Sequence, residues 1–294
     1  MRAAFASLVD YAGLFPPAAL GMADAVREYD RERRGPDRWM LGRFIVAASR
    51  LEELGTAIES EGLSTPRHDP WRVSAVMGVH LPDELSRVNA FRAAWEGRGV
   101  TVDALEYKVS SVGQLLTVAE QIPPAYQRFF EVPHEGPYGP LVAAIGRVGA
   151  FAKVRTGGTT ADLFPAPEQL TAFLIAATGQ GVRFKATAGL HHPYRGEYRL
   201  TYAPEAERGW MYGFVNLLVA TALLLRSGDG ETAQAILEAV GPEAFERDDA
   251  GIRALGHHFP WDELARARDR AFTSFGSCSF REPVDELGLP EQVA

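Results

Sequence analysis

The chain has 294 residues, 46% of them hydrophobic, which is enough for one large α/β barrel or for two smaller domains with full cores. Its net charge of −8 at pH 7 argues against a nucleic-acid partner and against an acidic membrane surface, and leaves small soluble molecules as partners. The single cysteine, Cys278, excludes an internal disulfide framework, and the N-terminal segment lacks a signal-peptide pattern, so we expect a cytoplasmic protein.

Short β-rich segments alternate with helical patterns along the chain. Eight segments are typical of strands: 7–14, 43–49, 72–79, 102–109, 128–133, 149–156, 182–189 and 273–280. The helical patterns between them include 22–34, 83–99, 113–122 and 167–181. This alternation implies parallel strands with crossover helices. We therefore expect an α/β fold, a closed (β/α)8 TIM barrel formed by residues 1–294 as one domain. An open dinucleotide-binding sheet is disfavoured, because no Gly-x-Gly-x-x-Gly turn follows the first strand.

The regular spacing ends after the seventh expected strand. Residues 194–272 form an insertion before the last strand, and their composition predicts helices over 206–226, 231–240 and 242–255. The most apolar run, 209–225, is shorter than the ~20 residues that a membrane span needs, so we expect a buried helix there. The insertion can cover the barrel mouth or form a homo-oligomer interface, and the sequence leaves both open.

Lysine is rare in this chain. Only Lys108, Lys153 and Lys185 occur among 30 basic residues, and all three lie in expected strands. A lysine, unlike an arginine, can lose its proton and attack a carbonyl group. The two-residue period of a strand places Lys153 with Arg155 on one face, and Lys185 with Arg183 on one face of the next strand. We expect both faces to point into the barrel, because the outer faces of barrel strands pack against helices, where charged side chains would be unfavourable.

Two inward lysines on neighbouring strands, ~5 Å apart, repel each other as cations. We expect one of them to relieve the repulsion by losing its proton, with a pKa lowered by burial and by the neighbouring charge. The neutral amine could then form a Schiff base. The alternative is that the lysines only pair with barrel carboxylates such as Glu106 and Glu131. The scarcity of lysine elsewhere favours the catalytic interpretation.

Several segments, taken in order, resemble the deoxyribose-phosphate aldolases, which are class I (Schiff-base) aldolases on a (β/α)8 barrel. LVDYAGLFPPAA is similar to the family's opening strand, VDALEYK to its fourth strand and RFFEVP to its fifth. AKVRTGG resembles the Lys-x-Ser-Thr-Gly strand that carries the Schiff-base lysine, and VRFKATAGL resembles the strand of the second lysine. SFGSCSF resembles the eighth strand, whose Gly-x-Ser turn helps to hold a phosphate. The resemblance covers most of the chain.

The resemblance implies a role for four residues. Lys153 would form the imine, Lys185 would lower the pKa of Lys153, and Asp103 would assist proton transfer. Asp10 would be a supporting polar residue. No metal or other cofactor is required by such a mechanism.

The chain also departs from the family. Arg155 replaces the serine of the lysine strand, which suits an anionic substrate, and AGLHHPYR replaces the glycine-pair loop after the seventh strand. The scaffold and the imine chemistry can thus be shared while the substrate, a small molecule bearing a carboxylate or phosphate, differs. The candidate substrate-binding residues are Asp10, Glu131, Arg155, Gly157, Gly158, Gly189, His191, His192, Gly276 and Ser277.

The fourth expected strand contains a conflict. Asp103 and Glu106 are separated by an odd number of residues, so both cannot face inward on a regular strand. The family resemblance favours Asp103, whereas Glu106 shares its face with Lys108. We expect Glu106 and Lys108 to line the site. A β-bulge would be needed for Asp103, Glu106 and Lys108 all to face the barrel interior.

Two other functions stay open at this point. Glu106, Glu131 and His191 could support a metal-assisted lyase or isomerase, or the barrel could bind a small anionic metabolite without catalysis. The histidines show no His-x-His or His-x-x-x-His spacing, so we expect no metal site. One of His191 and His192 is instead expected to bind substrate or to shuttle protons near neutral pH.

Overall fold

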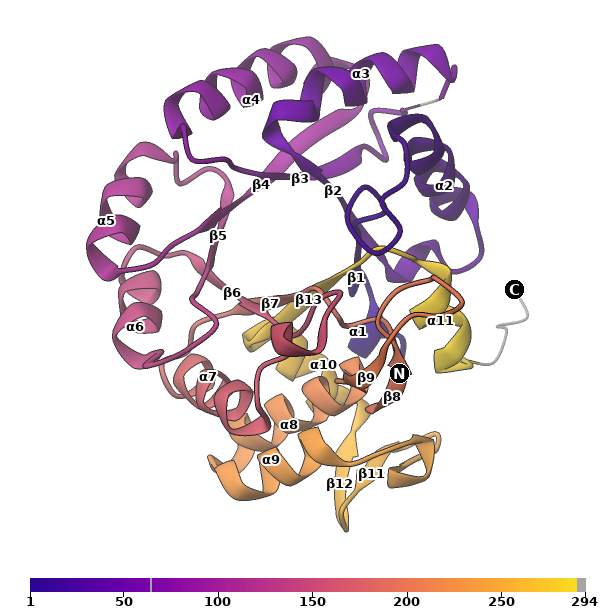
Figure 1. The fold of residues 1–294 in the computed structure, drawn as a ribbon, viewed down its shortest axis with the longest axis vertical. Coiled ribbons are helices and arrows are strands. Elements are labelled where there is room, and N and C mark those ends of the chain that lie inside the picture. The colour runs from indigo at the N-terminus through magenta and orange to yellow at the C-terminus, as the bar shows by residue number, and fades with distance from the viewer. Residues whose placement is uncertain (64, 290–294) are drawn as a thin grey trace.

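A closed barrel of eight parallel strands forms the centre of the computed structural model, which describes residues 1–63 and 65–289 (Figure 1). The expected TIM barrel is confirmed, and each barrel strand overlaps one predicted segment. In order around the barrel, the strands are β1 (Val9–Tyr11), β2 (Leu41–Ala47), β3 (Trp71–Val76), β4 (Val100–Lys108), β5 (Gln127–Glu131), β6 (Phe151–Arg155), β7 (Phe184–Thr187) and β13 (Phe272–Ser277).

Helices surround the barrel and connect successive strands (Figure 1). They pack on the outward faces of the strands, and this packing forms the main apolar core. On β2, for example, Phe44 and Val46 belong to that core, whereas Ile45 lines a cavity inside the barrel. The helices up to β7 are α1 (Arg2–Phe5), α2 (Met22–Arg34), α3 (Leu51–Ser60), α4 (Leu81–Trp95), α5 (Val112–Gln121), α6 (Gly139–Arg147) and α7 (Pro167–Gly179).

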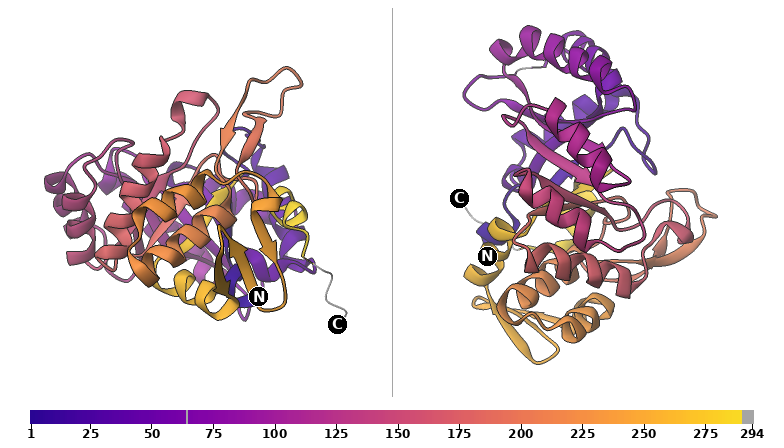
Figure 2. Two further views of the ribbon diagram at one scale, coloured as in Figure 1. Left: turned by 90° about the horizontal axis from the view of Figure 1, so that it is seen from below. Right: turned by 90° about the vertical axis from the view of Figure 1, so that its left-hand side faces the viewer.

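The insertion between β7 and β13 is only partly helical. It begins with an antiparallel hairpin of β8 (Gly196–Arg199) and β9 (Arg208–Met211), which stands out from one end of the barrel (Figure 2). The predicted helix over 206–226 therefore starts later, as α8 (Phe214–Ser227), and α9 (Gly230–Glu238) follows it. Within the described residues, we find no helix with both the length and the apolar character needed to cross a membrane.

The predicted helix over 242–255 is wrong. This part of the chain forms a small antiparallel sheet, because two turns interrupt it. The Asp248 carboxylate accepts hydrogen bonds from the backbone N–H groups of Ala250 and Gly251, at 2.8 and 2.9 Å. Leu255 and Gly256 both have positive φ, as a tight hairpin turn requires. The elements here are β10 (Phe245–Arg247), β11 (Gly251–Ala254), β12 (His257–Pro260) and α10 (Trp261–Arg270), with α11 (Arg281–Leu287) after β13.

Candidate active site

Charged side chains face each other on neighbouring strands inside the barrel. In the strand register, Glu131 of β5 lies beside Lys153 of β6, and Lys153 lies beside Lys185 of β7. On its other side, Lys185 is paired with Ser274 of β13. The two lysines are thus register partners on adjacent strands, as the sequence predicted.

Lys185 is held by two carboxylates at the centre of the barrel. Its Nζ lies 2.6 Å from Asp10 Oδ2 and 2.9 Å from Glu106 Oε1, and the residue is only 1% exposed. Asp10 also accepts hydrogen bonds from the Arg43 backbone N–H and the Ser274 hydroxyl, both at 2.8 Å. Lys185 is thus held directly from β1 and β4, and Asp10 is held in turn from β2 and β13.

Lys153 is also held by two carboxylates. Its Nζ lies 2.8 Å from both Glu106 Oε2 and Glu131 Oε2. Glu106 therefore bridges the two lysines, and the Ser74 hydroxyl donates a 2.7 Å hydrogen bond to its Oε1. The ion pairs that the alternative interpretation predicted are present.

The carboxylates reverse the expected pKa shift of Lys153. Burial by itself would lower this pKa, but Glu106 and Glu131 outweigh burial and raise it above its ordinary value. Burial, the largest influence, would by itself raise the pKa of each glutamate. Lys153 and Lys185 together lower the pKa of Glu106, and Lys153 with Arg155 lowers the pKa of Glu131. For Lys153 the prediction of a lowered pKa is wrong, because Glu106 and Glu131 both contact its ammonium group.

A β-bulge in β4 resolves the conflict between Asp103 and Glu106. The β3–β4 register passes from Val73↔Val102 to Ser74↔Ala104, so Asp103 is an extra residue without a partner. Its carboxylate accepts hydrogen bonds from Arg43 Nε at 2.6 Å and from Arg72 Nε at 2.8 Å. Within residues 1–63 and 65–289, Lys153 and Lys185 pair with Asp10, Glu106 and Glu131 and not with Asp103. The proton-transfer role that the resemblance implies for Asp103 is therefore not supported by a contact with either lysine.

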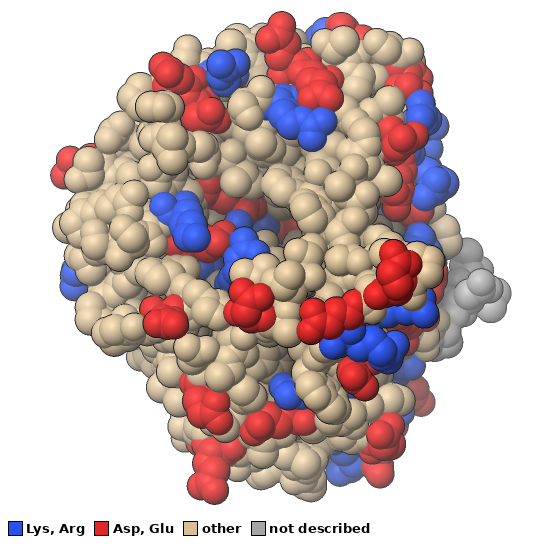
Figure 3. All heavy atoms as spheres, viewed as in Figure 1, with Lys and Arg blue, Asp and Glu red and all other residues tan. Residues whose placement is uncertain are grey.

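A cavity of about 360 Å³ lies at the carboxyl end of the barrel strands, above the two lysines. Figure 3 shows the hollow at the centre of this face, with acidic and basic side chains inside it. (β/α)8 enzymes hold their active sites at this end of the barrel. The lining residues are Ala12, Phe15, Pro16, Ile45, Val76, Glu106, Glu131, Lys153, Arg155, Gly158, Thr159, Leu163, Lys185, Thr187, Ala188, His191 and Gly276.

Lys108 differs from the other two lysines. It lies at the end of β4, exposed, and lines a separate hollow of about 350 Å³ with Met77, Val79 and Tyr107. The expectation that Lys108 lines the same site as Glu106 is therefore not met. The reason is its position: Lys108 is the last residue of β4, two residues beyond Glu106, and its side chain lies outside the barrel interior.

The two adjacent histidines have different surroundings. His191 lines the mouth cavity, and its Nδ1 lies 3.2 Å from the Ser277 hydroxyl. Burial, with His192 beside it, lowers the pKa of His191 to about 4, so its ring is neutral at pH 7. The His192 ring stacks on the Tyr198 ring, and its Nδ1 lies 2.8 Å from Glu286 Oε2. His192 does not line the mouth cavity.

Among the described residues, one group of His, Cys, Asp and Glu side chains brings its ligand atoms close enough together to share a metal ion. It consists of His192, Glu282 and Glu286. The residues of the metal-assisted alternative are not gathered in this way, since Glu106 and Glu131 bind the Lys153 ammonium between them.

The glycines of the loops after β6 and β7 allow these loops to touch. A Cβ at Gly189 would lie 2.7 Å from the backbone Cα of Gly157, and one at Gly157 would lie 2.3 Å from the ring of Phe164. Gly158 packs in the same manner against Leu163 and also lines the cavity. Close packing of the mouth loops thus explains all three glycines.

Gly189→Ala is expected to destabilise the protein more than Gly181→Ala. Both glycines have positive φ, so each substitution carries a backbone cost of about 1–2 kcal/mol. A Cβ at Gly181 meets nothing within 4 Å, whereas one at Gly189 meets backbone, which adds about 1–3 kcal/mol of overpacking. Urea unfolding of the two variants measures the difference, and equal midpoints would contradict the packing role.

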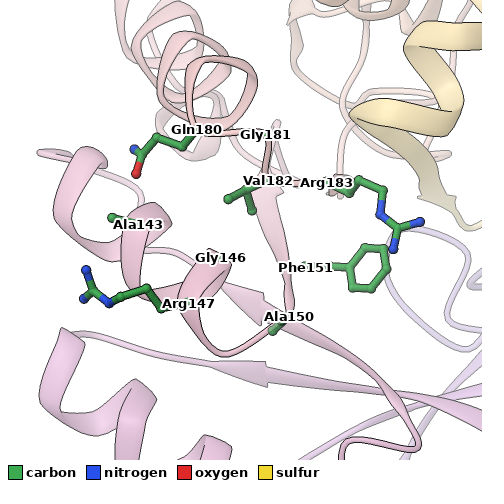
Figure 4. Close-up of a pocket in the computed structure, with 10 residues that line it drawn as sticks. Ala143, Gly146, Arg147, Ala150, Phe151, Gln180, Gly181, Val182 and Arg183 are labelled. Carbon is green, nitrogen blue, oxygen red and sulfur yellow. The ribbon is translucent and has the colours of Figure 1, made fainter.

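A larger hollow of about 580 Å³ lies at the opposite, amino end of β6 and β7 (Figure 4). Its wall includes Arg183, whose guanidinium stacks on the ring of Phe151 at 4.2 Å. None of the three lysines lines it. We therefore place the candidate active site at the mouth and not in this hollow.

Sequence reasoning missed the apolar part of the cavity wall and the residues that support the carboxylates. Ile45 and Val76 occupy ordinary positions in apolar strands, and Ser74 and Arg43 carry no motif. Only the strand period could have indicated that these residues share the inward face with the lysines.

Comparison of the chain with family models, with curated proteins and with solved structures found no match in any of the three. The resemblance to deoxyribose-phosphate aldolases therefore stays a prediction from motifs. The TIM barrel itself is compatible with many enzyme activities, so the function has to be argued from the site.

Proposed function

We infer that the protein is a lyase-type enzyme that acts on a small anionic carbonyl compound through a Schiff base on Lys153. The observation that carries this proposal is the position of the Lys153 amine, at the floor of the mouth cavity between two carboxylates. An arginine could form the same ion pairs but could not form an imine. The choice of lysine, in a chain that otherwise uses arginine, supports a chemical role.

Imine formation needs a group that removes a proton from Lys153, because the raised pKa keeps the amine protonated at rest. Glu131 fits this role. Its Oε2 contacts the lysine, its Oε1 lies 3.7 Å from Arg155, and it lines the cavity. Glu106 is bonded by Ser74, Lys153 and Lys185 and is 2% exposed, which suits it to holding the two lysines in place.

The proposed steps balance in protons and charge. Glu131 takes one proton from the Lys153 ammonium, and the neutral amine adds to the substrate carbonyl to give a carbinolamine. Protonated Glu131 then returns the proton to the departing hydroxyl, which leaves as water. An iminium remains, and the Glu131 carboxylate is restored. For cleavage, a hydroxyl on the departing carbon gives its proton to the Glu131 carboxylate, and that carbon leaves as an aldehyde. The iminium takes up the electron pair of the broken carbon–carbon bond and becomes an enamine on Lys153; the reverse sequence forms the bond.

Borohydride reduction in the presence of small aldehydes and oxo acids is expected to leave a stable adduct on Lys153. Peptide mass mapping should find it on Lys153 and not on Lys108 or Lys185. Trapping should slow as the pH falls, because the neutral fraction of an amine with a raised pKa decreases. Lys153→Arg keeps the positive charge and should lose the adduct completely.

An active Lys153→Arg variant would contradict the proposed chemistry. Activity that a chelator abolishes, with no trapped adduct, would favour the metal-assisted alternative. A ligand that binds without turnover or trapping would favour the non-catalytic barrel.

A further inference from the structure

The two sides of the mouth cavity differ in chemistry. Strands β4 to β7 contribute charged side chains, among them Glu106, Glu131 and Arg155. Strands β2 and β3 contribute only the apolar Ile45 and Val76. The segment after β1 extends the apolar side with Ala12, Phe15 and Pro16.

Ile45 and Val76 lie outside the two apolar clusters of the described residues. Ile45 is 5% exposed, but it belongs to neither of the two apolar clusters of the described residues, although its neighbours Phe44 and Val46 belong to the main one. Val76 is partly buried and is also absent from the residues that pack on these clusters. An apolar side chain is normally buried against other apolar groups. Both residues line the mouth cavity, so an apolar part of a ligand can pack against them.

Arg155 offers an anion site on the opposite side. Its side chain is 36% exposed; its Nη2 lies 3.7 Å from Glu131 Oε1, and its Nη1 donates a 3.3 Å hydrogen bond to the Gly157 carbonyl. A guanidinium has five N–H donors, so these contacts leave donors for a carboxylate. Glu131 contacts both Arg155 and Lys153, so the two cations are separated by a single carboxylate side chain. A 2-oxo acid can therefore place its carboxylate at Arg155 and its neighbouring carbonyl carbon at Lys153.

The charges at the site favour a monoanion. Asp10, Glu106 and Glu131 balance Lys153, Lys185 and Arg155. A carboxylate substrate leaves one negative charge in excess, whereas a phosphate dianion leaves two, inside a barrel that screens charge poorly. Sugar hydroxyls placed against Ile45 and Val76 would also lose their hydrogen bonds to water without replacement.

We propose that the substrate is a short 2-oxo monocarboxylate with an apolar chain, whose chain contacts Ile45 and Val76 and whose carboxylate binds Arg155. This proposal rests on the proposed Schiff-base function. It names an amphipathic oxo acid as the substrate class and places hydroxylated sugar phosphates outside it.

The test is borohydride trapping with a matched series of carbonyl compounds: pyruvate, 2-oxobutanoate, 2-oxopentanoate, pentanal and 2-deoxyribose 5-phosphate. The concentration for half-maximal trapping on Lys153 should fall about tenfold from pyruvate to 2-oxopentanoate, because two methylenes leave water. Arg155→Gln should raise this concentration more for the oxo acids than for pentanal, which has no carboxylate. Trapping of the sugar phosphate at lower concentration than every oxo acid would overturn the proposal.

Val76→Thr gives a second, nearly isosteric test. The hydroxyl should remove most of the chain-length preference, because it weakens trapping of 2-oxopentanoate more than trapping of pyruvate. The control Val79→Thr, at an 84% exposed position, should leave the preference unchanged. An unchanged preference in Val76→Thr would overturn the apolar contact.

The proposal can be tested even if the Schiff base is absent. If no carbonyl compound is trapped, the proposed function fails, and calorimetry with 2-hydroxypentanoate, which cannot form an imine, tests the binding site alone. Binding that weakens in Arg155→Gln and in Val76→Thr supports the substrate class. No binding, or binding that neither variant weakens, overturns it.

Discussion

Lys185→Met is expected to lower the free energy of unfolding by about 3–5 kcal/mol at pH 7, because it removes one partner from a buried ion-pair network. Lys185 is 1% exposed and contacts Asp10 and Glu106, which are as deeply buried. Without it, Asp10 loses its lysine partner and Glu106 keeps only Lys153. Methionine has a similar length, so the change is in charge more than in volume. Urea unfolding monitored by circular dichroism measures the loss.

The pH dependence of this effect has a definite sign. In the native protein the pKa values of Glu106 and Glu131 are lowered, so their contribution to stability is present above the unfolded pKa and is lost as the pH falls through the folded values. In Lys185→Met the buried carboxylates lose a cation, and protonation at low pH removes the negative charge that this cation balanced. The difference in free energy of unfolding between the variant and the native protein should therefore shrink as the pH falls.

The double variant Lys185→Met/Asp10→Asn serves as the control, because it removes one charge of each sign. It should be more stable than the sum of the two single variants predicts. A loss below about 1 kcal/mol in Lys185→Met, or strict additivity in the cycle, would show that the buried ion pairs contribute little.

Glu131→Gln is expected to slow imine formation at pH 7 by about 10²-fold or more, the usual effect of removing a general acid–base. Glutamine keeps the shape of the side chain but cannot carry a proton between the amine and the carbinolamine. The rate of borohydride trapping with a saturating oxo acid measures the effect. Glu135→Gln, at an exposed position four residues further on, is the matched control and should behave as the native protein does.

The direction of the Glu131→Gln effect separates two roles. Glu131 also raises the pKa of Lys153, so its removal increases the neutral fraction of the amine. If Glu131 had only this electrostatic role, trapping at pH 7 would become faster. A slower reaction whose pH profile moves to lower pH is expected only if Glu131 transfers protons.

Strand periodicity and turn signals were sufficient for the barrel but failed in the insertion. All eight barrel strands were predicted because parallel strands and crossover helices alternate with regular spacing. The β10–β12 sheet was missed, because its turns at Asp248 and at Leu255–Gly256 depend on local hydrogen bonds and positive φ values rather than on periodicity.

The candidate site was predicted unevenly. Lys153 and Lys185 were placed side by side from the two-residue period and the strand order, and the structure has them in register. Their electrostatics could not be predicted in the same way. Which carboxylate pairs with which lysine depends on the closed barrel, which brings Asp10 to Lys185, Glu131 to Lys153 and Glu106 to both.

The sequence by itself determined the parallel α/β barrel and the two inward lysines, because periodicity and residue type act locally along the chain. Only the tertiary structure decided the protonation of Lys153, the bulge that turns Asp103 toward Arg43 and Arg72, and the apolar side of the mouth cavity. Each of these depends on contacts between residues far apart in the chain, since charge, register and packing act through space.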